Sequence, residues 1–296
     1  MADQAERMRE IFQCGQAFKM PRQSGLARTF VVASGKGGVG KSNIVVNLAL
    51  IFGQWGHKII ILDTDLGMAN VNILLNIQPQ YTLIDVLQGR KELQDVILQG
   101  PSNVEVLPGG SGLSQVVNLD SQQREQLLAH FSYLEEKGDI LLVDCAAGLS
   151  RDVLSFIAAA DELVLVTTPE PTAMMDVYSI IKIVNNYGLH SRISMIVNMA
   201  GSVQDGADVF ERIRRVSSNF LDVEVTFLGG IEYDQNVRRS VLNSCPYVLQ
   251  YPRSRAAQST RLIARRMLPG AESLQAGPRA AVQEEGFLRR LLRLWR

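Results

Sequence analysis

The stretch Gly35-Lys36-Gly37-Gly38-Val39-Gly40-Lys41-Ser42 decides the fold. It follows the short apolar run Phe30–Ala33 and opens the apolar, helix-like run Ser42–Trp55. It matches the pattern GxxxxGK[ST], in which glycines let backbone N–H groups approach phosphate oxygens at a helix N-terminus. A glycine-rich turn without a ligand is the alternative, and the strand–loop–helix context disfavours it. We therefore expect residues 35–42 and the adjoining Asn43 to bind the phosphates of a nucleotide.

Two residues at the end of this loop have separate expected roles. Lys41 should bridge the β- and γ-phosphates, and the hydroxyl of Ser42 should coordinate Mg²⁺. A third candidate, Asp144, follows the apolar run Ile140–Val143. A carboxylate at the end of a buried strand is the Walker-B arrangement that holds hydrated Mg²⁺, so Asp144 is a predicted metal ligand.

Short β-branched apolar runs alternate with longer amphipathic stretches along the chain. The predicted strands are Phe30–Ala33, Lys58–Leu62, Val104–Leu107, Ile140–Val143, Leu163–Thr167, Ile193–Val197 and Val223–Leu228. The predicted helices include Ser42–Trp55, Gln122–Glu136, Pro171–Tyr187 and Ala207–Ser218. This alternation predicts an α/β fold with a doubly wound, mostly parallel sheet. We expect one P-loop domain at residues 28–268, an N-terminal arm and linker at 1–27, a polar linker at 269–285 and an amphipathic helix at 286–296.

An additional lysine, Lys36, makes the loop a KGGVGK[ST] variant. This variant resembles the deviant P-loop of the MinD/ParA family of SIMIBI-type ATPases. The resemblance implies ATP and Mg²⁺ as ligands, a homodimer that forms with ATP, and a Lys36 that reaches the phosphates bound by the other subunit. Such a lysine would neutralise transition-state charge as an arginine finger does, so Lys36 and Lys41 are the predicted catalytic lysines.

The run from Ile59 to Asn70 resembles the DxD switch segment of the same family. By that match Asp65 would orient or deprotonate the attacking water, and Asp63 would support the metal or the switch. The family pattern that begins at Asp144 is D-[ST]-[GP]-A-G. This chain departs from it at two positions, because Cys145 replaces the serine or threonine and Ala146 replaces the glycine or proline.

Asn198 ends the predicted strand Ile193–Val197. Its amide offers a donor and an acceptor together, which suits the edge of an adenine base. We therefore expect Asn198 to contact the nucleotide, although an asparagine at a strand end is often a turn residue.

The N-terminal run Asp3-Gln4-Ala5-Glu6-Arg7-Met8-Arg9 resembles the DQAxxLR motif of the flagellar-number regulators called FlhG, FleN or YlxH. In that family the arm activates the GTPase of FlhF, a signal-recognition-type protein. The resemblance implies that Gln4, Arg7 and Met8 contact this partner. It also implies flagellar C-ring proteins, and a flagellar master transcription activator, as further partners. A frayed, solvated helix is the alternative for this short segment.

The C-terminal run from Gly286 to Arg296 has an amphipathic helical pattern. The apolar residues that share one face are Phe287, Leu288, Leu291, Leu292 and Trp295, opposite an arginine-rich face. Trp, Phe and Leu against arginine predict a helix that lies on an anionic membrane surface. The alternative is a helix that docks on its own core or on a partner.

Composition limits the function classes. The chain of 296 residues has 30 Lys+Arg and 30 Asp+Glu, and this zero net charge argues against a protein that coats DNA by bulk electrostatics. Its three cysteines form no CxxC pair, which disfavours a disulfide framework or a bridged metal cluster. The N-terminus lacks a signal-peptide pattern and there is no apolar run of spanning length, so we expect a cytoplasmic protein peripherally associated with the inner face of the cell membrane.

These observations predict a Mg²⁺-dependent ATPase that acts as a dimerising, membrane-associating switch for flagellar number and placement. A MinD-like division-site regulator or a ParA-like DNA-partition ATPase is one alternative. A nucleotide-binding scaffold without significant turnover is another.

Overall fold

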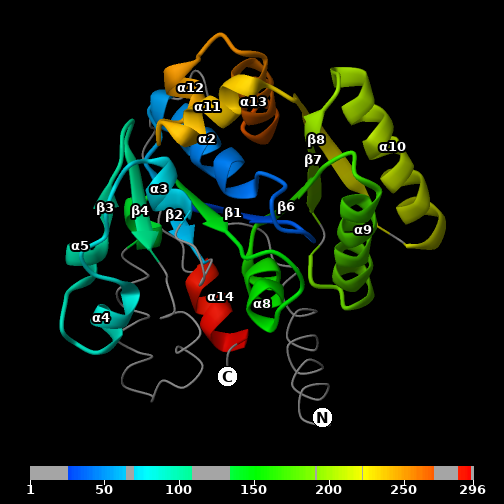
Figure 1. The fold of residues 1–296 in the computed structure, drawn as a ribbon. Coiled ribbons are helices and arrows are strands. Elements are labelled where there is room, and N and C mark those ends of the chain that lie inside the picture. Colours follow the sequence, from blue (N-terminus) through cyan, green and yellow to red (C-terminus); the bar gives the residue numbers. More distant parts are fainter. Residues whose placement is uncertain are drawn as a thin grey trace.

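Buried apolar strands form the centre of the molecule, in a sheet that helices cover on both sides (Figure 1). The computed structural model describes residues 26–64, 70–108, 134–190, 192–221, 223–269 and 286–294. Its strands are β1 (Arg28–Ala33), β2 (Ile59–Asp63), β3 (Leu98–Gln99), β4 (Val104–Pro108), β5 (Ile140–Asp144), β6 (Glu162–Thr167), β7 (Ile193–Ala200) and β8 (Val225–Glu232). Its helices are α2 (Lys41–Gln54), α3 (Asn70–Leu74), α4 (Leu83–Leu87), α5 (Leu93–Val96), α8 (Arg151–Ala159), α9 (Pro171–Asn186), α10 (Val203–Phe220), α11 (Gln235–Leu242), α12 (Tyr247–Gln250), α13 (Arg255–Met267) and α14 (Phe287–Leu294).

The strand order is β3-β4-β2-β5-β1-β6-β7-β8. All neighbouring strands are parallel except β3, a two-residue edge strand that runs antiparallel to β4. This confirms the predicted doubly wound, mostly parallel sheet. In the middle of the sheet Asp144 of β5 is paired in register with Val32 of β1 and with Asp63 of β2. The carboxyl ends of three strands therefore meet at one edge, which is where ligands bind in folds of this kind.

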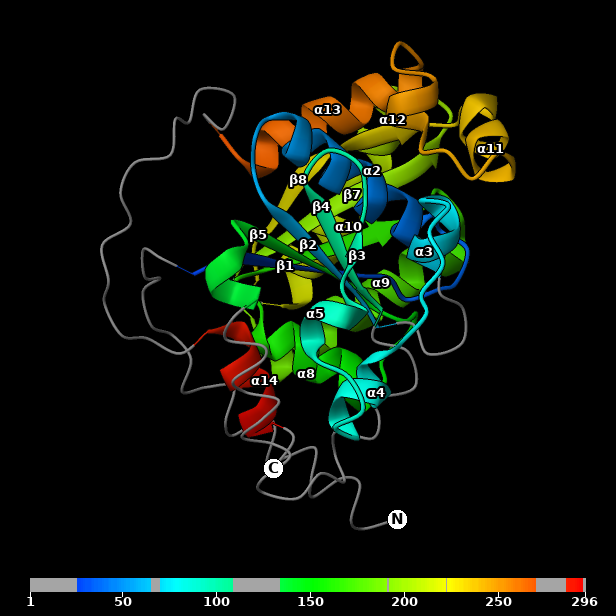
Figure 2. The same ribbon diagram turned by 90° about the vertical axis from the view of Figure 1, so that its left-hand side faces the viewer.

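Side chains of each strand alternate between two apolar cores, one on each face of the sheet. In β1, Phe30 and Val32 belong to the core under α2, α12 and α13, whereas Val31 and Ala33 belong to the core under α8 and α9. Figure 2 shows these two helical layers above and below the sheet. Because both faces are covered, the central strands are apolar on both sides, as a parallel sheet requires.

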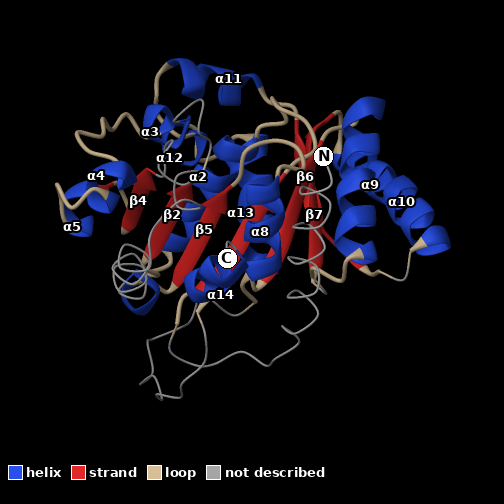
Figure 3. Ribbon diagram, turned by 90° about the horizontal axis from the view of Figure 1, so that it is seen from below, coloured by secondary structure: helices blue, strands red, loops and turns tan. Residues whose placement is uncertain are grey.

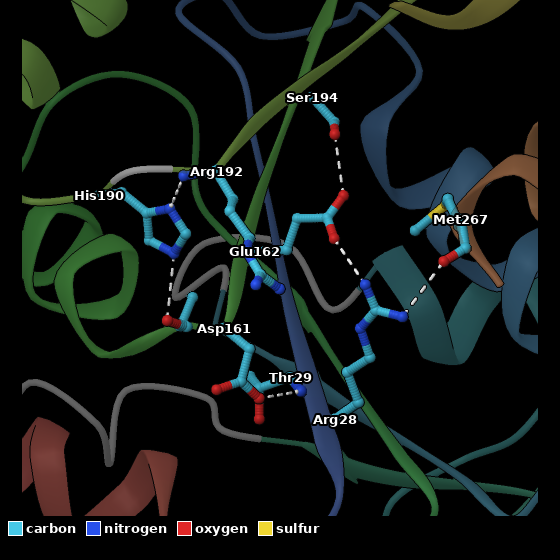
Figure 4. A network of polar contacts seen from close by, with 9 residues as sticks. Arg28, Thr29, Asp161, Glu162, His190, Arg192, Ser194 and Met267 are labelled. Atoms are coloured by element: carbon cyan, nitrogen blue, oxygen red, sulfur yellow. Dashed lines mark hydrogen bonds and ion pairs between the residues drawn. The ribbon is translucent and has the colours of Figure 1, made fainter. Parts of the chain in front are cut away.

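A polar network joins the amino ends of β1, β6 and β7 (Figure 4). The carboxylate of Glu162 accepts hydrogen bonds from Arg28 (2.9 Å) and from the hydroxyl of Ser194 (2.8 Å). Nearby, His190 lies within hydrogen-bond distance of the Ala160 carbonyl and accepts from the backbone N–H of Arg192. Burial lowers the pKa of His190, which favours the neutral ring that this pairing requires.

The C-terminal helix α14 lies beside α8 on the same side of the sheet (Figure 3). Its buried stripe consists of Phe287, Leu291 and Leu294, which are 1–3% exposed. The ring of Phe287 stacks on that of Phe156 of α8, with centroids 6.3 Å apart. On the edge of this contact Arg290 forms an ion pair with Asp161 at 2.9 Å.

This docking buries the apolar face that we expect to lie on lipid, so membrane contact by this face stays a prediction. In the structure, Phe287 and Leu291 pack against the core instead, as the docked alternative predicts. The buried stripe also includes Leu294, because spacings of four and three residues return to the same side of a helix. The side chains of Leu288 and Leu292, and Trp295, lie outside what the structure describes. No helix in the described part of the chain is long and apolar enough to cross a bilayer.

We expect Phe287→Ala to loosen α14 without unfolding the sheet. Loss of a buried ring costs about 3–5 kcal/mol in a core, which is large for a single helix of eight residues. Hydrogen exchange of the α14 amides should therefore accelerate, while the central strands stay protected. The matched control is Arg289→Ala, because Arg289 is exposed on the same helix. Equal protection of α14 in wild type and Phe287→Ala would show that the stacked ring does not hold the helix.

Candidate functional site

The phosphate loop connects β1 to α2 at the carboxyl edge of the sheet. Lys36, Gly37 and Gly38 are exposed, whereas Val39 and Lys41 are buried. Gly40 is the N-cap residue of α2 and has φ 86°, a left-handed conformation that favours glycine. Because the first N–H groups of a helix have no partner within it, the start of α2 directs hydrogen-bond donors toward the loop.

Neighbouring elements approach the loop closely at two glycines. A Cβ on Gly35 would overlap the backbone of Asp176 in α9. A Cβ on Gly40 would overlap the side-chain amide of Asn198, which lies near the end of β7. These contacts explain why Gly35 and Gly40 have to be glycine even when no nucleotide is bound.

Lys41 forms a buried ion pair with Asp144, the residue that ends β5. The lysine is 8% exposed and the aspartate 0%. The second carboxylate oxygen of Asp144 is buried and has no hydrogen-bond partner among the described residues. A buried carboxylate oxygen without a partner is energetically costly, so this atom is well suited to a cation.

The carboxylate of Asp63 is buried beside Asp144, because the two residues are paired in register. The backbone N–H of Val71 lies 3.4 Å from one of its oxygens. Ser42 is the second residue of α2, directly after Lys41. Mg²⁺ prefers oxygen ligands and is usually held by one or two carboxylates together with phosphates and water. Ser42, Asp63 and Asp144 therefore fit a Mg²⁺ ion that binds with a nucleotide, which would supply a charge-neutralising centre for its phosphates.

Cys145 directly follows Asp144 and is fully buried. Burial raises the pKa of its thiol to about 12, so the thiol stays protonated at neutral pH. This environment suits a small structural side chain and excludes a reactive thiolate.

Lys36 takes a different direction from Lys41. Its ammonium group lies 2.6 Å from a carboxylate oxygen of Glu170 and 3.4 Å from the hydroxyl of Thr172. The side chains of Lys36 and Glu170 are 44% and 62% exposed, so this ion pair is at the surface and weak. Sequence reasoning did not identify Glu170 as the partner of Lys36, because they are 134 residues apart.

Asn198 supports the loop from the side. Its amide nitrogen donates a hydrogen bond of 2.7 Å to the carbonyl of Val39. This hydrogen bond uses one of the two amide donors, and the predicted contact with adenine stays a prediction.

A further support, Asn47, was not predicted. It is a fully buried polar residue of α2, whose amide donates to the carbonyl and side-chain oxygens of Asn43 at 2.7 and 2.8 Å. Its own oxygen accepts from the backbone N–H of Val248 in α12 at 3.0 Å. A polar residue within an otherwise apolar helix was the signal that could have identified it.

The other predicted site residues cannot be compared with the structure. Asp65, in the segment after β2, lies outside the described residues. So do Gln4, Arg7 and Met8 of the N-terminal arm.

We expect Gly40→Ala to destabilise the protein, because the new Cβ meets the Asn198 amide and the backbone is left-handed. The cost should be about 1–3 kcal/mol in the free energy of unfolding, measured by denaturant titration. Gly37→Ala is the matched control, since a Cβ there meets nothing within 4 Å. Adding Asn198→Ala to Gly40→Ala should recover part of the loss. An unchanged free energy of unfolding in Gly40→Ala would contradict the steric argument.

Comparison with known proteins agrees with this geometry. Residues 25–268 match the ParA family, described as NUBPL iron-transfer P-loop NTPase. The chain is 40% identical over 265 residues to the antiactivator FleN of Pseudomonas aeruginosa, covering 90% of this chain and 93% of FleN. It is 30% identical over 254 residues to the flagellum site-determining protein YlxH of Helicobacter pylori, covering 81% and 82%.

A solved structure has the same fold. The septum site-determining protein MinD from Pyrococcus horikoshii, in complex with Mg-ADP, superposes with a TM-score of 0.66 at 28% identity, over 84% of this chain and 99% of that one. The phosphate loop, the acidic ends of β2 and β5 and these relatives all indicate the same family. The chain belongs to the MinD/ParA family of P-loop ATPases, together with FleN and YlxH.

Proposed function

We propose that this protein is an ATP-driven switch that dimerises with ATP and Mg²⁺ and controls the number and placement of flagella. The observation that carries the proposal is the position of Lys36. Its ammonium group lies outside its own phosphate site, on the exposed carboxylate of Glu170, whereas Lys41 is buried against Asp144. A surface lysine held by a weak ion pair can exchange Glu170 for the phosphates bound by a second subunit at little cost.

The flagellar part of the proposal comes from the relatives. FleN is named an antiactivator and YlxH a flagellum site-determining protein. Both are similar to this chain over most of its length, which supports a related role here. Flagellar C-ring proteins and a master transcription activator are the partners that we propose on this basis.

Hydrolysis in the proposed dimer divides into three tasks. Asp65 orients the attacking water, and Lys41 together with Lys36 of the other subunit neutralises charge on the transferred phosphoryl group. Ser42, Asp63 and Asp144 hold the metal. Opening of the dimer after hydrolysis then resets the switch.

We expect Lys36→Ala to abolish the ATP-dependent dimer, measured by light scattering after size exclusion, while ATP binding to the monomer persists. Glu170→Gln is the matched control, because it removes the surface ion pair and leaves Lys36 in place, so dimerisation should persist. Asp65→Ala should keep the dimer and reduce phosphate release at least about a hundredfold. Unchanged turnover in Asp65→Ala would contradict the water-positioning role and favour a scaffold without significant turnover.

We propose that the N-terminal arm stimulates an FlhF-type GTPase through Gln4, Arg7 and Met8. An amide, a guanidinium and an apolar anchor on a short helix suit insertion at a partner's catalytic site. Deleting residues 2–9 should abolish stimulation of GTP hydrolysis by that partner, measured by phosphate release. ATP-dependent dimerisation of the truncated chain is the control. Full stimulation by the truncated chain would exclude the arm.

Membrane association is the last part of the proposal. Because Phe287 and Leu291 are buried against the core, α14 must leave α8 before they can enter lipid. We propose that dimerisation with ATP favours this release, and that two released helices in one dimer bind the inner face of the cell membrane by avidity.

A further inference from the structure

The arginines of residues 235–269 are not balanced by acids. This segment, which contains α11, α12 and α13, has seven arginines and no Asp, Glu or Lys. Six of the arginines are exposed, and we call five of them the arginine face: Arg238, Arg239, Arg253, Arg255 and Arg266. Figures 1 and 2 show α11–α13 together at one end of the molecule, on the opposite side of the sheet from α14.

Little within the protein neutralises this charge. The guanidinium groups of Arg238, Arg239 and Arg253 have no hydrogen-bond or ion-pair partner among the described residues. Arg255 is 77% exposed and lies 3.9 Å from Glu232, at the limit of an ion pair. Arg266 donates to the uncharged carbonyl of Leu228.

Four arginines elsewhere in the described part of the chain are paired more closely. The ion pairs of Arg28, Arg90, Arg214 and Arg290 with carboxylates measure 2.7–2.9 Å. Arg238, Arg239 and Arg253 therefore bring together cations without close counter-charges on one group of neighbouring helices, which favours an anionic partner.

Exposed leucines lie among these arginines. Leu242, at the end of α11, is 76% exposed and follows Arg238 by one helical turn. Leu262, on α13, is 53% exposed and lies between Arg255 and Arg266 along one side of the helix. Arginine with protruding leucine suits the boundary between lipid headgroups and acyl chains. Contacts with nucleic-acid phosphates use cations and polar groups and have no use for such leucines.

We infer that the arginine face is a second membrane contact, which binds anionic phospholipid headgroups while Leu242 and Leu262 reach into the headgroup layer. The inference rests on the proposed membrane association through α14. One lipid-binding element gives only marginal attachment, and stable attachment needs a second signal such as a basic surface. The face is exposed while α14 is docked, so it can make the first contact with a membrane before α14 is released.

Chain length allows both contacts to be made together. Nineteen residues, 268–286, separate the end of α13 from the start of α14. A chain of nineteen residues spans at most about 65 Å when fully extended, so α13 and a released α14 can both reach one bilayer. An inserted α14 would hold α13 close to the same bilayer.

The test is co-sedimentation of the full chain with vesicles, in ATP and in ADP with Mg²⁺. One vesicle is phosphatidylcholine, and the other contains about one third phosphatidylglycerol. The test variant is Arg238→Gln/Arg239→Gln/Arg253→Gln. The matched control is Arg212→Gln/Arg214→Gln/Arg215→Gln on α10, which removes the same charge from exposed positions elsewhere. Thermal melting and ATP binding of both variants verify folding.

We expect the test variant to bind the anionic vesicles about 100-fold more weakly, from about fivefold for each of the three arginines near the surface. Its binding to phosphatidylcholine, and both affinities of the control, should equal those of wild type. Wild-type binding of the test variant to anionic vesicles would overturn the inference and leave the role of α14 intact. If wild type binds neither vesicle, the proposed membrane association fails, and this inference with it. Tighter binding of duplex DNA than of vesicles, lost in the test variant, would make the face a nucleic-acid surface.

Discussion

The buried ion pair between Lys41 and Asp144 constrains everything around it. Two opposite charges in an apolar interior compensate each other, and removing either one leaves the other uncompensated at a cost of about 3–5 kcal/mol. If Lys41 turned to a phosphate without a replacement cation, Asp144 would be left in that state. A cation bound to Asp144 without a phosphate would likewise leave the buried charge of Lys41 uncompensated. Nucleotide and metal therefore have to enter together, and this coupling follows from burial and not from any contact between them.

Sheet topology supplies the two partners of this pair. Parallel strands end at one edge, so the loop after β1 and the acidic ends of β2 and β5 meet there although they are far apart in sequence. Support comes from the flanks, where Asn198 on β7 holds the Val39 carbonyl and Asn47 ties the first turn of α2 to α12. Both asparagines use side-chain amides to restrain a loop whose own glycines provide little rigidity.

How much could be predicted from the sequence depends on how local the signal is. The runs Phe30–Ala33 and Ile140–Val143 are apolar at every position, because both faces of the sheet are covered, and each lies within an observed strand. The edge strand β3 has two residues and is half polar, too short for a periodic pattern. The partner of Lys36 and the supports of the loop depend on contacts over more than a hundred residues, which no local pattern encodes.

The C-terminal helix illustrates a limit of a different kind. The sequence pattern predicts an apolar face correctly, but an apolar face fits lipid and protein equally well. In the structure this face packs on protein, because Phe287, Leu291 and Leu294 are buried in the core. The same side chains cannot be buried in both places at once, so docking and membrane insertion exclude each other. The arginine face has no such conflict, because it is exposed in the docked state. A net charge of zero for the whole chain therefore conceals two different surfaces. The basic surface is exposed in the docked state, whereas the apolar stripe of α14 becomes exposed only when the helix leaves the core.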